Sequence, residues 1–415
     1  MPLKVVVVGA GLAGLGAAIA LNRSGHEVQV IEQSGFLNEV GAAIHVAPNA
    51  TRILREWGCD FEKLQPVFCT KVQLWTSAGD YISTPVVTKN VQERLGITDE
   101  FLLTHRVDLH NTLRDTAAKE VDGRRVDIRL SSRVVSVDAE AGQVTVEDGS
   151  VYTGDLIIGA DGIHSRSVRC ITGDEERKDN TGQNCYRFLV PVSKMQANPL
   201  TASLLQRTGL DGMHGFISDD RRLVFYPCRR GELLNAAGIY PSGSGTAAKD
   251  SSWLNSAGQD ALLETFESFS PELREMCRIA EDVKVWSLGS RKPPRTFVKG
   301  KLALAGDAAH PTLPHQGQGG AQSLEDAAAL GALFTSDITP EQVPERLKLY
   351  NQVRYDHSVT VMMMSKLPDN RRAEMLDELR SYVPAAELPQ DMFSFTWNSY
   401  PGREAQRALK PDSMV

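Results

Sequence analysis

The segment from Leu302 to Leu330 constrains the fold more than any other stretch of the chain. It begins as an apolar run, Leu302 to Ala305, which is typical of a buried strand, and the run stops at Gly306 and Asp307. A turn rich in proline and glycine follows, and an alanine-rich helical pattern resumes near Ser323. A strand, loop and helix in this order direct unpaired backbone N–H groups at one point, which suits an anionic or electron-rich ligand.

The loop in this segment has almost no side chain that could pack in a core. Residues 306–319 hold two histidines, two prolines, two glutamines and three glycines. A lone Gly-Asp pair would be an ordinary turn, but this composition favours a ligand-binding loop. Asp307 ends the strand and can accept hydrogen bonds from ligand hydroxyls, while Gly317, Gly319 and Gly320 let a flat ligand approach the backbone.

The N-terminal residues have the pattern of a dinucleotide-binding βαβ unit. Val5 to Val8 is a β-branched run, Gly9, Gly11 and Gly14 form a GxGxxG motif before a helical stretch, and a second strand closes with Glu32. Glu32 would accept hydrogen bonds from the ribose diol and repel a 2′-phosphate. The bound dinucleotide is therefore expected to be FAD or NAD rather than NADP, and the motif does not choose between these two.

A third strand of the same kind, Leu156 to Ile158, ends in Asp161-Gly162. Taken alone, this is also compatible with an Asp-Gly turn that Ser165 caps. Three strand-end sites in this order resemble the single-component FAD-dependent aromatic hydroxylases, in particular the salicylate hydroxylase-like and fungal FAD-dependent monooxygenases. The resemblance extends over about residues 3–360 of the chain.

The resemblance implies FAD as the cofactor, NADPH or NADH as the reductant and dioxygen as a co-substrate. For Arg106 the alternative is a solvated arginine, and His45 belongs either to the substrate site or to the core. No metal site is expected. The positions that the resemblance assigns to the cofactor are Gly9, Gly11, Gly14, Glu32, Gly41, Ala43, Arg106, Asp161, Asp307, Pro314, Gly317, Gly319 and Gly320.

The expected architecture is an α/β fold in which a Rossmann-like FAD-binding domain is discontinuous. This domain comprises residues 1–72, 100–180 and 290–340. An inserted α+β substrate domain with an antiparallel sheet comprises residues 73–99 and 181–289. A C-terminal helix and tail occupy residues 341–415.

Three residues match catalytic positions of the resembled family: Arg187, Tyr226 and His315. Arg187 would hold a phenolic substrate as an anion, Tyr226 would orient or help deprotonate its hydroxyl, and His315 could relay protons beside the flavin. The alternatives are a surface arginine on a strand and a half-buried tyrosine of the sheet. Arg222 lies four residues before Tyr226, on the same strand face, and is a weaker candidate for the pocket.

The reaction implied is hydroxylation of a phenolic or other electron-rich aromatic compound through a flavin C(4a)-hydroperoxide, with or without loss of carbon dioxide. Two alternatives stay open. One is an FAD-dependent oxidoreductase of the same superfamily without oxygen insertion, and the other is a flavin-binding protein whose redox state regulates a partner.

Composition limits the possible partners. The formal net charge of −7 and a pI near 5.8 give no overall attraction to nucleic acid or anionic membranes. The six cysteines are scattered, as expected for reduced thiols in an intracellular protein. Val5 to Leu21 is apolar, but its four glycines and the strand that follows favour a βαβ unit over a secretory signal. We expect a cytoplasmic monomer or homodimer that acts on a small aromatic molecule and has no integral membrane segment.

Overall fold

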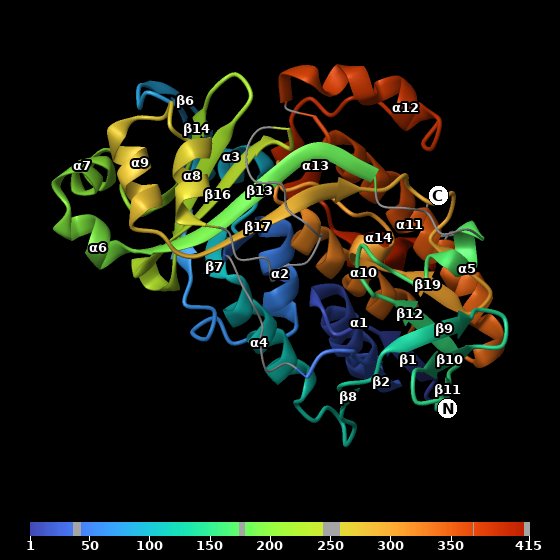
Figure 1. Ribbon diagram of the computed structural model, residues 1–415. Coiled ribbons are helices and arrows are strands. Elements are labelled where there is room, and N and C mark those ends of the chain that lie inside the picture. Colours follow the sequence, from blue (N-terminus) through green and yellow to red (C-terminus); the bar gives the residue numbers. More distant parts are fainter. Residues whose placement is uncertain (36–42, 174–178, 244–257, 368, 411–415) are drawn as a thin grey trace.

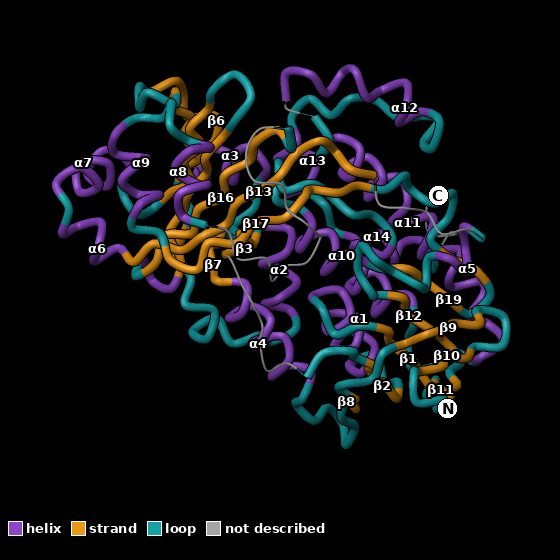
Figure 2. Tube along the Cα trace, viewed as in Figure 1, coloured by secondary structure: helices purple, strands orange, loops and turns teal. Residues whose placement is uncertain are grey.

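The computed structural model describes residues 1–35, 43–173, 179–243, 258–367 and 369–410. Its strands gather into two large groups (Figure 2), and each belongs to a different sheet. The first sheet has six strands in the order β18-β19-β12-β1-β2-β8. In that order their bounds are Val298–Lys299, Leu302–Leu304, Leu156–Gly159, Lys4–Val8, Glu27–Ile31 and Asp127–Arg129.

The first sheet is parallel except for β18, and its central strands are buried on both faces. Val5 to Val8 are at most 3% exposed, which explains why this strand is a continuous apolar run rather than an alternating one. Helices α1 (Leu12–Arg23) and α10 (Gly319–Leu333) pack against each other beside the sheet (Figure 1). This is the Rossmann-like arrangement expected from the sequence.

The second sheet has seven strands in the order β17-β13-β16-β15-β14-β5-β6, all antiparallel to their neighbours except for the parallel pair β14 and β5. β5 and β6 come from the early region, residues 73–99, that was expected to belong to the substrate domain, together with Lys71 and Val72. The sheet begins at Lys71, two residues before the limit expected from the sequence. In the same order the bounds are Glu281–Ser290, Asp179–Pro191, Leu233–Pro241, Arg222–Cys228, Gly212–Ile217, Lys71–Thr76 and Tyr81–Val87.

The two faces of this sheet carry different side chains. On one face Phe188, Leu223 and Phe225 belong to an apolar cluster shared with nearby helices. Those helices are α6 (Val192–Ala197), α7 (Pro199–Thr208), α8 (Gln259–Thr265) and α9 (Pro271–Arg278). The opposite face presents Arg187 and Tyr226, because side chains alternate between the faces of a strand.

Smaller elements join the two sheets. A three-stranded sheet contains β3 (Ala43–Val46), β7 (Leu102–His105) and β4 (Val67–Phe68), so the turn-rich stretch near residue 45 contains a strand. Helix α4 (Arg106–Ala117) packs against this sheet, whereas α2 (Pro48–Glu56) packs against α10 and α3 (Thr88–Leu95) against β6. Apolar and polar residues alternate between Val134 and Val151, and this stretch forms an antiparallel meander of β9 (Val134–Asp138), β10 (Gln143–Val146) and β11 (Val151–Thr153). Helix α5 (Arg169–Thr172) lies further along the chain.

The C-terminal part is helical and returns onto the body of the molecule. Its long helix is α11 (Val343–Met364), followed by α12 (Leu376–Arg380), α13 (Met392–Trp397) and α14 (Pro401–Ala408). Helix α14 packs against α10 and α11. Met362, Met363 and Met364 are fully buried and fill the core at the end of α11.

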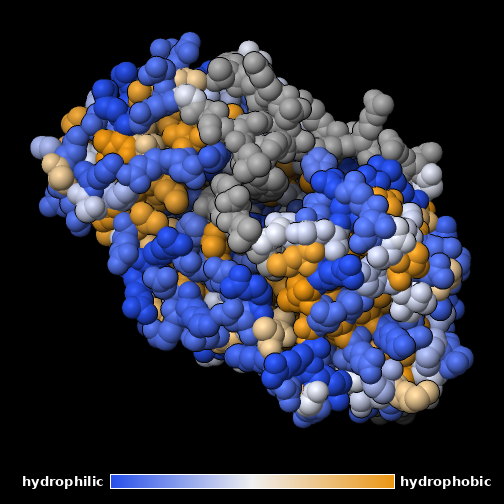
Figure 3. All heavy atoms as spheres, turned by 60° about the horizontal axis from the view of Figure 1, so that its bottom comes forward, coloured by the Kyte–Doolittle hydropathy of each residue, from blue (hydrophilic) through white to orange (hydrophobic). Residues whose placement is uncertain are grey.

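The surface mixes polar and apolar side chains, as the face in Figure 3 shows. Within the described part of the chain, no helix combines the length and apolar character that crossing a membrane requires.

Candidate cofactor and active site

The carboxyl ends of β1, β12 and β19 meet at one edge of the first sheet, and the glycine motif lies there. Gly9 has a φ of +98°, and a Cβ on it would come within 2.5 Å of the Ala160 carbonyl oxygen. Gly14 packs directly against the Gly9 carbonyl, whereas a Cβ on Gly11 would meet no atom within 4 Å. The turn is therefore closed on one side and open at Gly11, which leaves room for a pyrophosphate.

Glu32 stands at the end of β2 and is held by the backbone. Its Oε2 accepts a hydrogen bond of 2.7 Å from the Ala10 N–H, and its Oε1 accepts one of 2.7 Å from the Ser34 N–H. Each carboxylate oxygen has a further lone pair. The fixed carboxylate can therefore still accept hydrogen bonds from a ribose diol.

Asp307 follows β19. Its side chain is accessible to solvent, but many protein atoms lie close around the carboxyl group. Burial among these atoms raises the pKa of the Asp307 carboxyl, while His310, Arg291 and Arg106 act against the rise. Arg106 is the first residue of α4, and it is near enough to Asp307 for its charge to act on the carboxyl. Arg291 was missed in the sequence; its Nη2 donates to the Asp307 carbonyl oxygen at 3.2 Å and to that of Ala308.

Asp161 lies at the same edge but is engaged within its own loop. Its carboxylate accepts hydrogen bonds from the Ser165 hydroxyl at 2.7 Å and from the N–H groups of Arg166 and Ser167 at 2.7 and 3.0 Å. This geometry supports a role in shaping the loop, and a direct contact with the cofactor stays a prediction.

The glycine-rich loop after β19 is shorter than expected, because α10 begins at Gly319 and not near Ser323. Gly319 and Gly320 are therefore the first residues of a helix whose N-terminus has no side-chain cap. His45 of β3 lies directly against this loop, and a Cβ on Gly317, which has a φ of +60°, would overlap its ring. Burial lowers the pKa of His45 to about 4, against the effect of hydrogen bonds that the ring donates to the Gly317 and Gln316 backbone, so the ring is neutral at pH 7.

The open face of the seven-stranded sheet carries the candidate catalytic residues. Arg187, Ala237 and Val224 are aligned across β13, β16 and β15, and Tyr226 lies two residues beyond Val224 on the same face. The Tyr226 hydroxyl donates to the Ala43 carbonyl oxygen at 3.0 Å. Burial raises the pKa of Tyr226 well above its usual value, and Arg187 partly offsets that rise.

Arg187 is placed for recognition of an anion. Its guanidinium carbon lies 5.1 Å from the centre of the Trp286 ring, in a cation–π arrangement. Its Nε atom is buried and has no hydrogen-bond partner among the described residues. Such a donor is costly to leave unpaired, which favours a ligand oxygen at this point.

His315 lies close enough to Arg222 for the charge of the guanidinium to act on its ring. Burial and, to a smaller extent, the positive charge of Arg222 together lower the pKa of His315 to about 4. Its Nδ1 is buried without a hydrogen-bond partner in the described part of the chain. The structure thus groups Arg187 with Tyr226 and His45, and His315 with Arg222. Pro314 precedes His315 in the same loop, and Gly41 lies outside the described residues.

A buried network of charges beneath Gly306 was also missed from the sequence. Arg354 is fully buried, and it donates through Nε to Asp326 Oδ1 at 2.8 Å and through Nη1 to Glu325 Oε2 at 2.9 Å. Asp326 Oδ2 accepts the Gly306 N–H at 2.8 Å and lies 2.6 Å from His310 Nε2. Burial would raise the pKa of Asp326, but His310 and Arg354 outweigh it and hold the pKa below its usual value. The network fixes the backbone from which Asp307 projects.

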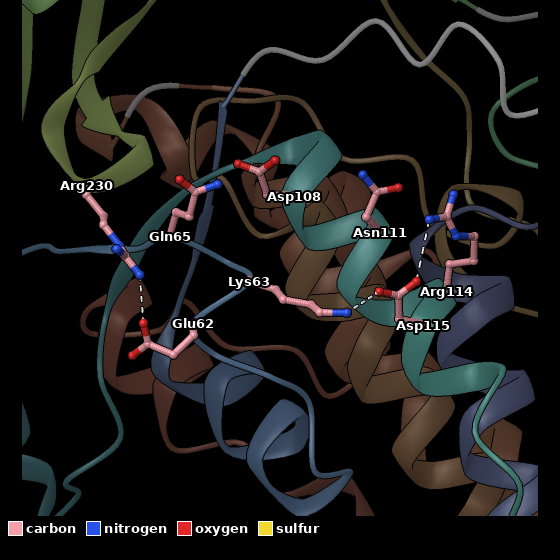
Figure 4. Close-up of a pocket in the computed structure, with 8 residues that line it drawn as sticks. All are labelled: Glu62, Lys63, Gln65, Asp108, Asn111, Arg114, Asp115 and Arg230. Carbon is pink, nitrogen blue, oxygen red and sulfur yellow. Dashed lines mark hydrogen bonds and ion pairs between the residues drawn. The ribbon is translucent and has the colours of Figure 1, made fainter.

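A recess of about 540 Å³ lies elsewhere, between α4 and the region near residue 62 (Figure 4). Its charged groups pair with one another: Arg230 with Glu62 at 2.7 Å, and Lys63 with Asp115 at 2.5 Å. Because these charges are already paired, the recess has few groups free to bind the phosphates of a dinucleotide, and its polar lining does not suit an apolar ring. We therefore do not assign the active site to it. The lining residues are Glu62, Lys63, Gln65, Asp108, Asn111, Arg114, Asp115 and Arg230.

The family model described as "FAD binding domain" matches residues 2–365, and the chain belongs to this family. It is an FAD-dependent monooxygenase, which uses a reduced nicotinamide and dioxygen; the resemblance, the fold class and the cofactor expected from the sequence are confirmed. The open glycine turn, the fixed Glu32 and the unpaired Arg187 donor fit a bound FAD and a substrate beside it.

Several characterised proteins are similar to this chain over most of their length. An FAD-dependent monooxygenase, cfoG, from Aspergillus candidus is 34% identical, over 96% of this chain and 92% of the relative. Hispidin-3-hydroxylase from Neonothopanus nambi is 32% identical, over 86% of each protein. Among solved structures, CtdE in complex with FAD and substrate superimposes with a TM-score of 0.80 at 20% identity, over 99% of this chain and 98% of that one. A salicylate hydroxylase substrate complex has a TM-score of 0.75 at 24% identity, over 99% of each chain.

Proposed function

We propose that this enzyme hydroxylates a small phenolic or other electron-rich aromatic compound, bound between the loop at residues 313–317 and the open face of the seven-stranded sheet. The observation that carries the proposal is the buried, unpartnered Nε of Arg187 on that face. Relatives named for phenolic substrates, such as hispidin-3-hydroxylase and 3-hydroxybenzoate 6-hydroxylase, support it.

Arg187 would bind the substrate as a phenolate. A phenolate is a much better nucleophile than a phenol, and a guanidinium stabilises it through charge-assisted hydrogen bonds. The Trp286 ring beneath the guanidinium keeps the cation in place. A charge-assisted bond of this kind contributes about 1.5–3 kcal/mol, or roughly a tenfold to hundredfold change in affinity.

Tyr226 would orient the substrate rather than deprotonate it. Its raised pKa keeps the phenol neutral at pH 7, and its O–H is already donated to Ala43. The remaining lone pairs of the Tyr226 oxygen can accept a hydrogen bond from the substrate hydroxyl before it loses its proton and becomes the phenolate that Arg187 would hold. Of the two roles expected from the sequence, the raised pKa and the hydrogen bond to Ala43 support orientation of the substrate.

His315 would relay the proton that the substrate releases. At pH 7 it is neutral, since its pKa is about 4, and a neutral imidazole can accept a proton at one nitrogen while it donates from the other. Apolar side chains complete the chamber and exclude water: Cys185, Ile239, Leu288 and Leu313. Arg222 would line the far side, next to His315.

Bound FAD, once reduced by NADH or NADPH, supplies the activation of dioxygen. The chain's own residues hold the ring, set its charge and keep water out. A substrate with a carboxylate on the attacked carbon would lose carbon dioxide, and one without it would gain a hydroxyl group.

Substitution of Arg187 tests the proposal. Arg187→Gln should raise KM for the preferred phenol by roughly tenfold to a hundredfold, because the charge-assisted bond is lost. Arg187→Lys is the matched control, because it keeps the charge without the planar fork and should lie between the wild type and Arg187→Gln. If Arg187→Gln keeps the wild-type KM and product yield, the assignment is wrong.

The same proposal includes the finer organisation of the molecule. The FAD-binding domain would comprise residues 1–72, 100–180 and 290–340, with the substrate domain inserted, and the cofactor contacts would be those named from the sequence. All six cysteines are free thiols, which supports a cytoplasmic location. We also propose a monomer or homodimer that does not bind nucleic acid; light scattering of the purified protein would measure the subunit number.

A further inference from the structure

A short C-terminal segment, residues 391–400, lies against both parts of the molecule and is named the bridge segment here. On the substrate side, Arg94 of α3 donates to Asp391 Oδ2 at 3.2 Å and to Ser394 Oγ at 3.1 Å. On the cofactor side, Arg52 of α2 donates to the carbonyl oxygens of Trp397 at 2.7 Å and Ser399 at 2.8 Å. The bridge segment therefore ties α2 to α3.

Arg52 is built into this contact. Only 7% of it is exposed, its Nε donates to Asp99 at 3.1 Å, and its guanidinium lies 3.8 Å from the centre of the Tyr400 ring. A buried arginine held by a carboxylate, two carbonyls and an aromatic ring cannot easily rearrange. The position of the main chain at Trp397 is thus fixed.

The side chain of Trp397 extends from this fixed backbone towards the active site. It is fully buried, in an apolar cluster that also contains Ala43 and Tyr226. Its ring lies edge-on to Phe101 at a centroid distance of 5.3 Å, and Phe101 lies edge-on to His45, also at 5.3 Å. His45 in turn presses on Gly317, so an unbroken line of contacts joins the bridge segment to the glycine-rich loop.

We propose that Trp397 is a positioning residue for catalysis. Through Phe101 it holds the His45 ring against Gly317, and His45 sets the distance between the loop and the sheet face that carries Tyr226. The match to the family model ends at residue 365, so this support comes from a part of the chain that the family model does not include. Phe395, which stacks on His357 of α11 at 4.5 Å, anchors the bridge segment on its other side.

The test compares three variants of the FAD-loaded enzyme. Trp397→Leu removes the ring contact, Trp397→Phe keeps an aromatic ring there, and Phe334→Leu is the matched control, because Phe334 is also fully buried but belongs to the core cluster of the first sheet. Hydrogen–deuterium exchange at residues 314–320 reports the loop directly. The fraction of NAD(P)H oxidised without product reports the positioning of the substrate.

Trp397→Leu should raise exchange in the loop and reduce product formation on the order of tenfold to a hundredfold, as expected for a displacement of about 1 Å at a reacting centre. Trp397→Phe should show loop exchange and product formation close to those of the wild type. Phe334→Leu should change neither loop exchange nor product formation, even where it destabilises the protein as much as Trp397→Leu does. Wild-type loop exchange in Trp397→Leu, or the same changes in Phe334→Leu, would overturn the proposal.

If Trp397→Leu does not fold, Arg52→Gln gives the same information without emptying the core. It should release the carbonyl oxygens of Trp397 and Ser399 and raise loop exchange to a smaller extent, and unchanged exchange would overturn the proposal. The product readout rests on the aromatic substrate proposed above, whereas the exchange readout does not. A failure of the substrate assignment is therefore distinguishable from a failure of the positioning role.

Discussion

Substitution of Gly317 by alanine probes the contact on which the geometry of the loop depends. A Cβ at Gly317 would overlap the His45 ring, and the residue has a φ of +60°, where an L side chain is unfavourable. Either His45 or the loop must move, on the order of 1 Å, since the Phe101 ring stands edge-on to His45.

Two separate costs follow from this substitution. The left-handed backbone conformation costs about 1–2 kcal/mol of folding free energy in a residue with a Cβ. Displacement of the loop should lower coupled product formation on the order of a hundredfold, because misplacement by about 1 Å can have that effect. The loss of folding free energy comes from the backbone conformation alone, and the loss of coupled product formation comes from the contact with His45.

A double variant separates these two costs. His45→Ala removes the ring, so Gly317→Ala in that background should lose the overlap and keep only the backbone cost. Coupling in the double variant should then equal that of His45→Ala alone, because the loss of coupling that Gly317→Ala causes in the wild-type background needs the His45 ring. Product yield per NAD(P)H, measured with stability by urea unfolding, gives both quantities. If Gly317→Ala matches the wild type, or if His45→Ala does not relieve it, the contact is not what positions the loop.

Three further outcomes are expected. Arg354→Met should cost about 3–5 kcal/mol in urea unfolding, because Glu325 and Asp326 would be left as unpaired buried charges; a loss below about 1 kcal/mol would contradict the network. His214 has a pKa lowered to about 4 by burial, below its usual 6.5, so the folded state binds its proton less readily and stability falls as the pH falls from 6.5 to 4. Between pH 7 and pH 5 the free energy of unfolding of His214→Leu should therefore fall by about 2 kcal/mol less than that of the wild type. An equal fall in both proteins would contradict this. Glu32→Ala should weaken FAD binding by roughly tenfold to a hundredfold in a fluorescence titration, and an unchanged affinity would count against its role.

The parallel sheet could be predicted from sequence because its signals are local. Each of β1, β12 and β19 is an apolar run that leads into glycine, and an aspartate follows closely after β12 and β19. Parallel strands bring their carboxyl ends to one edge. The meander at β9 to β11 was readable for a similar reason, since alternation and the Asp148-Gly149 turn are close together in the chain.

The buried network could not be predicted, because its members are distant in sequence. Arg354 binds Asp326 across 28 residues, and nothing local distinguishes it from a surface arginine on a helix. A signal was present in the acidic pair Glu325-Asp326 within an alanine-rich stretch, where charges need buried partners. Only the fold identifies the partner.

Strand pairing between remote segments was equally hidden. β14 lies parallel to β5, although about 140 residues separate them, and no turn signal connects the two. The bridge segment was also missed, because a polar, proline-containing tail does not reveal that Trp397 inserts into the core beside Phe101. The local candidates Arg187 and Tyr226 were found only through the family resemblance, since a single strand does not disclose which face meets the cofactor.

The most direct measurement of the central claim begins with the purified protein and its visible spectrum. NADH and NADPH oxidation under air is then followed with and without a panel of phenols, salicylates and resorcinols, and products are analysed by mass. The account predicts a yellow protein whose NAD(P)H consumption rises with one aromatic compound, and a product that gains one oxygen atom or exchanges a carboxyl group for a hydroxyl group. A yellow protein that responds to none of these compounds would contradict the proposed substrate class, and a protein that cannot be reconstituted with FAD would contradict the account as a whole.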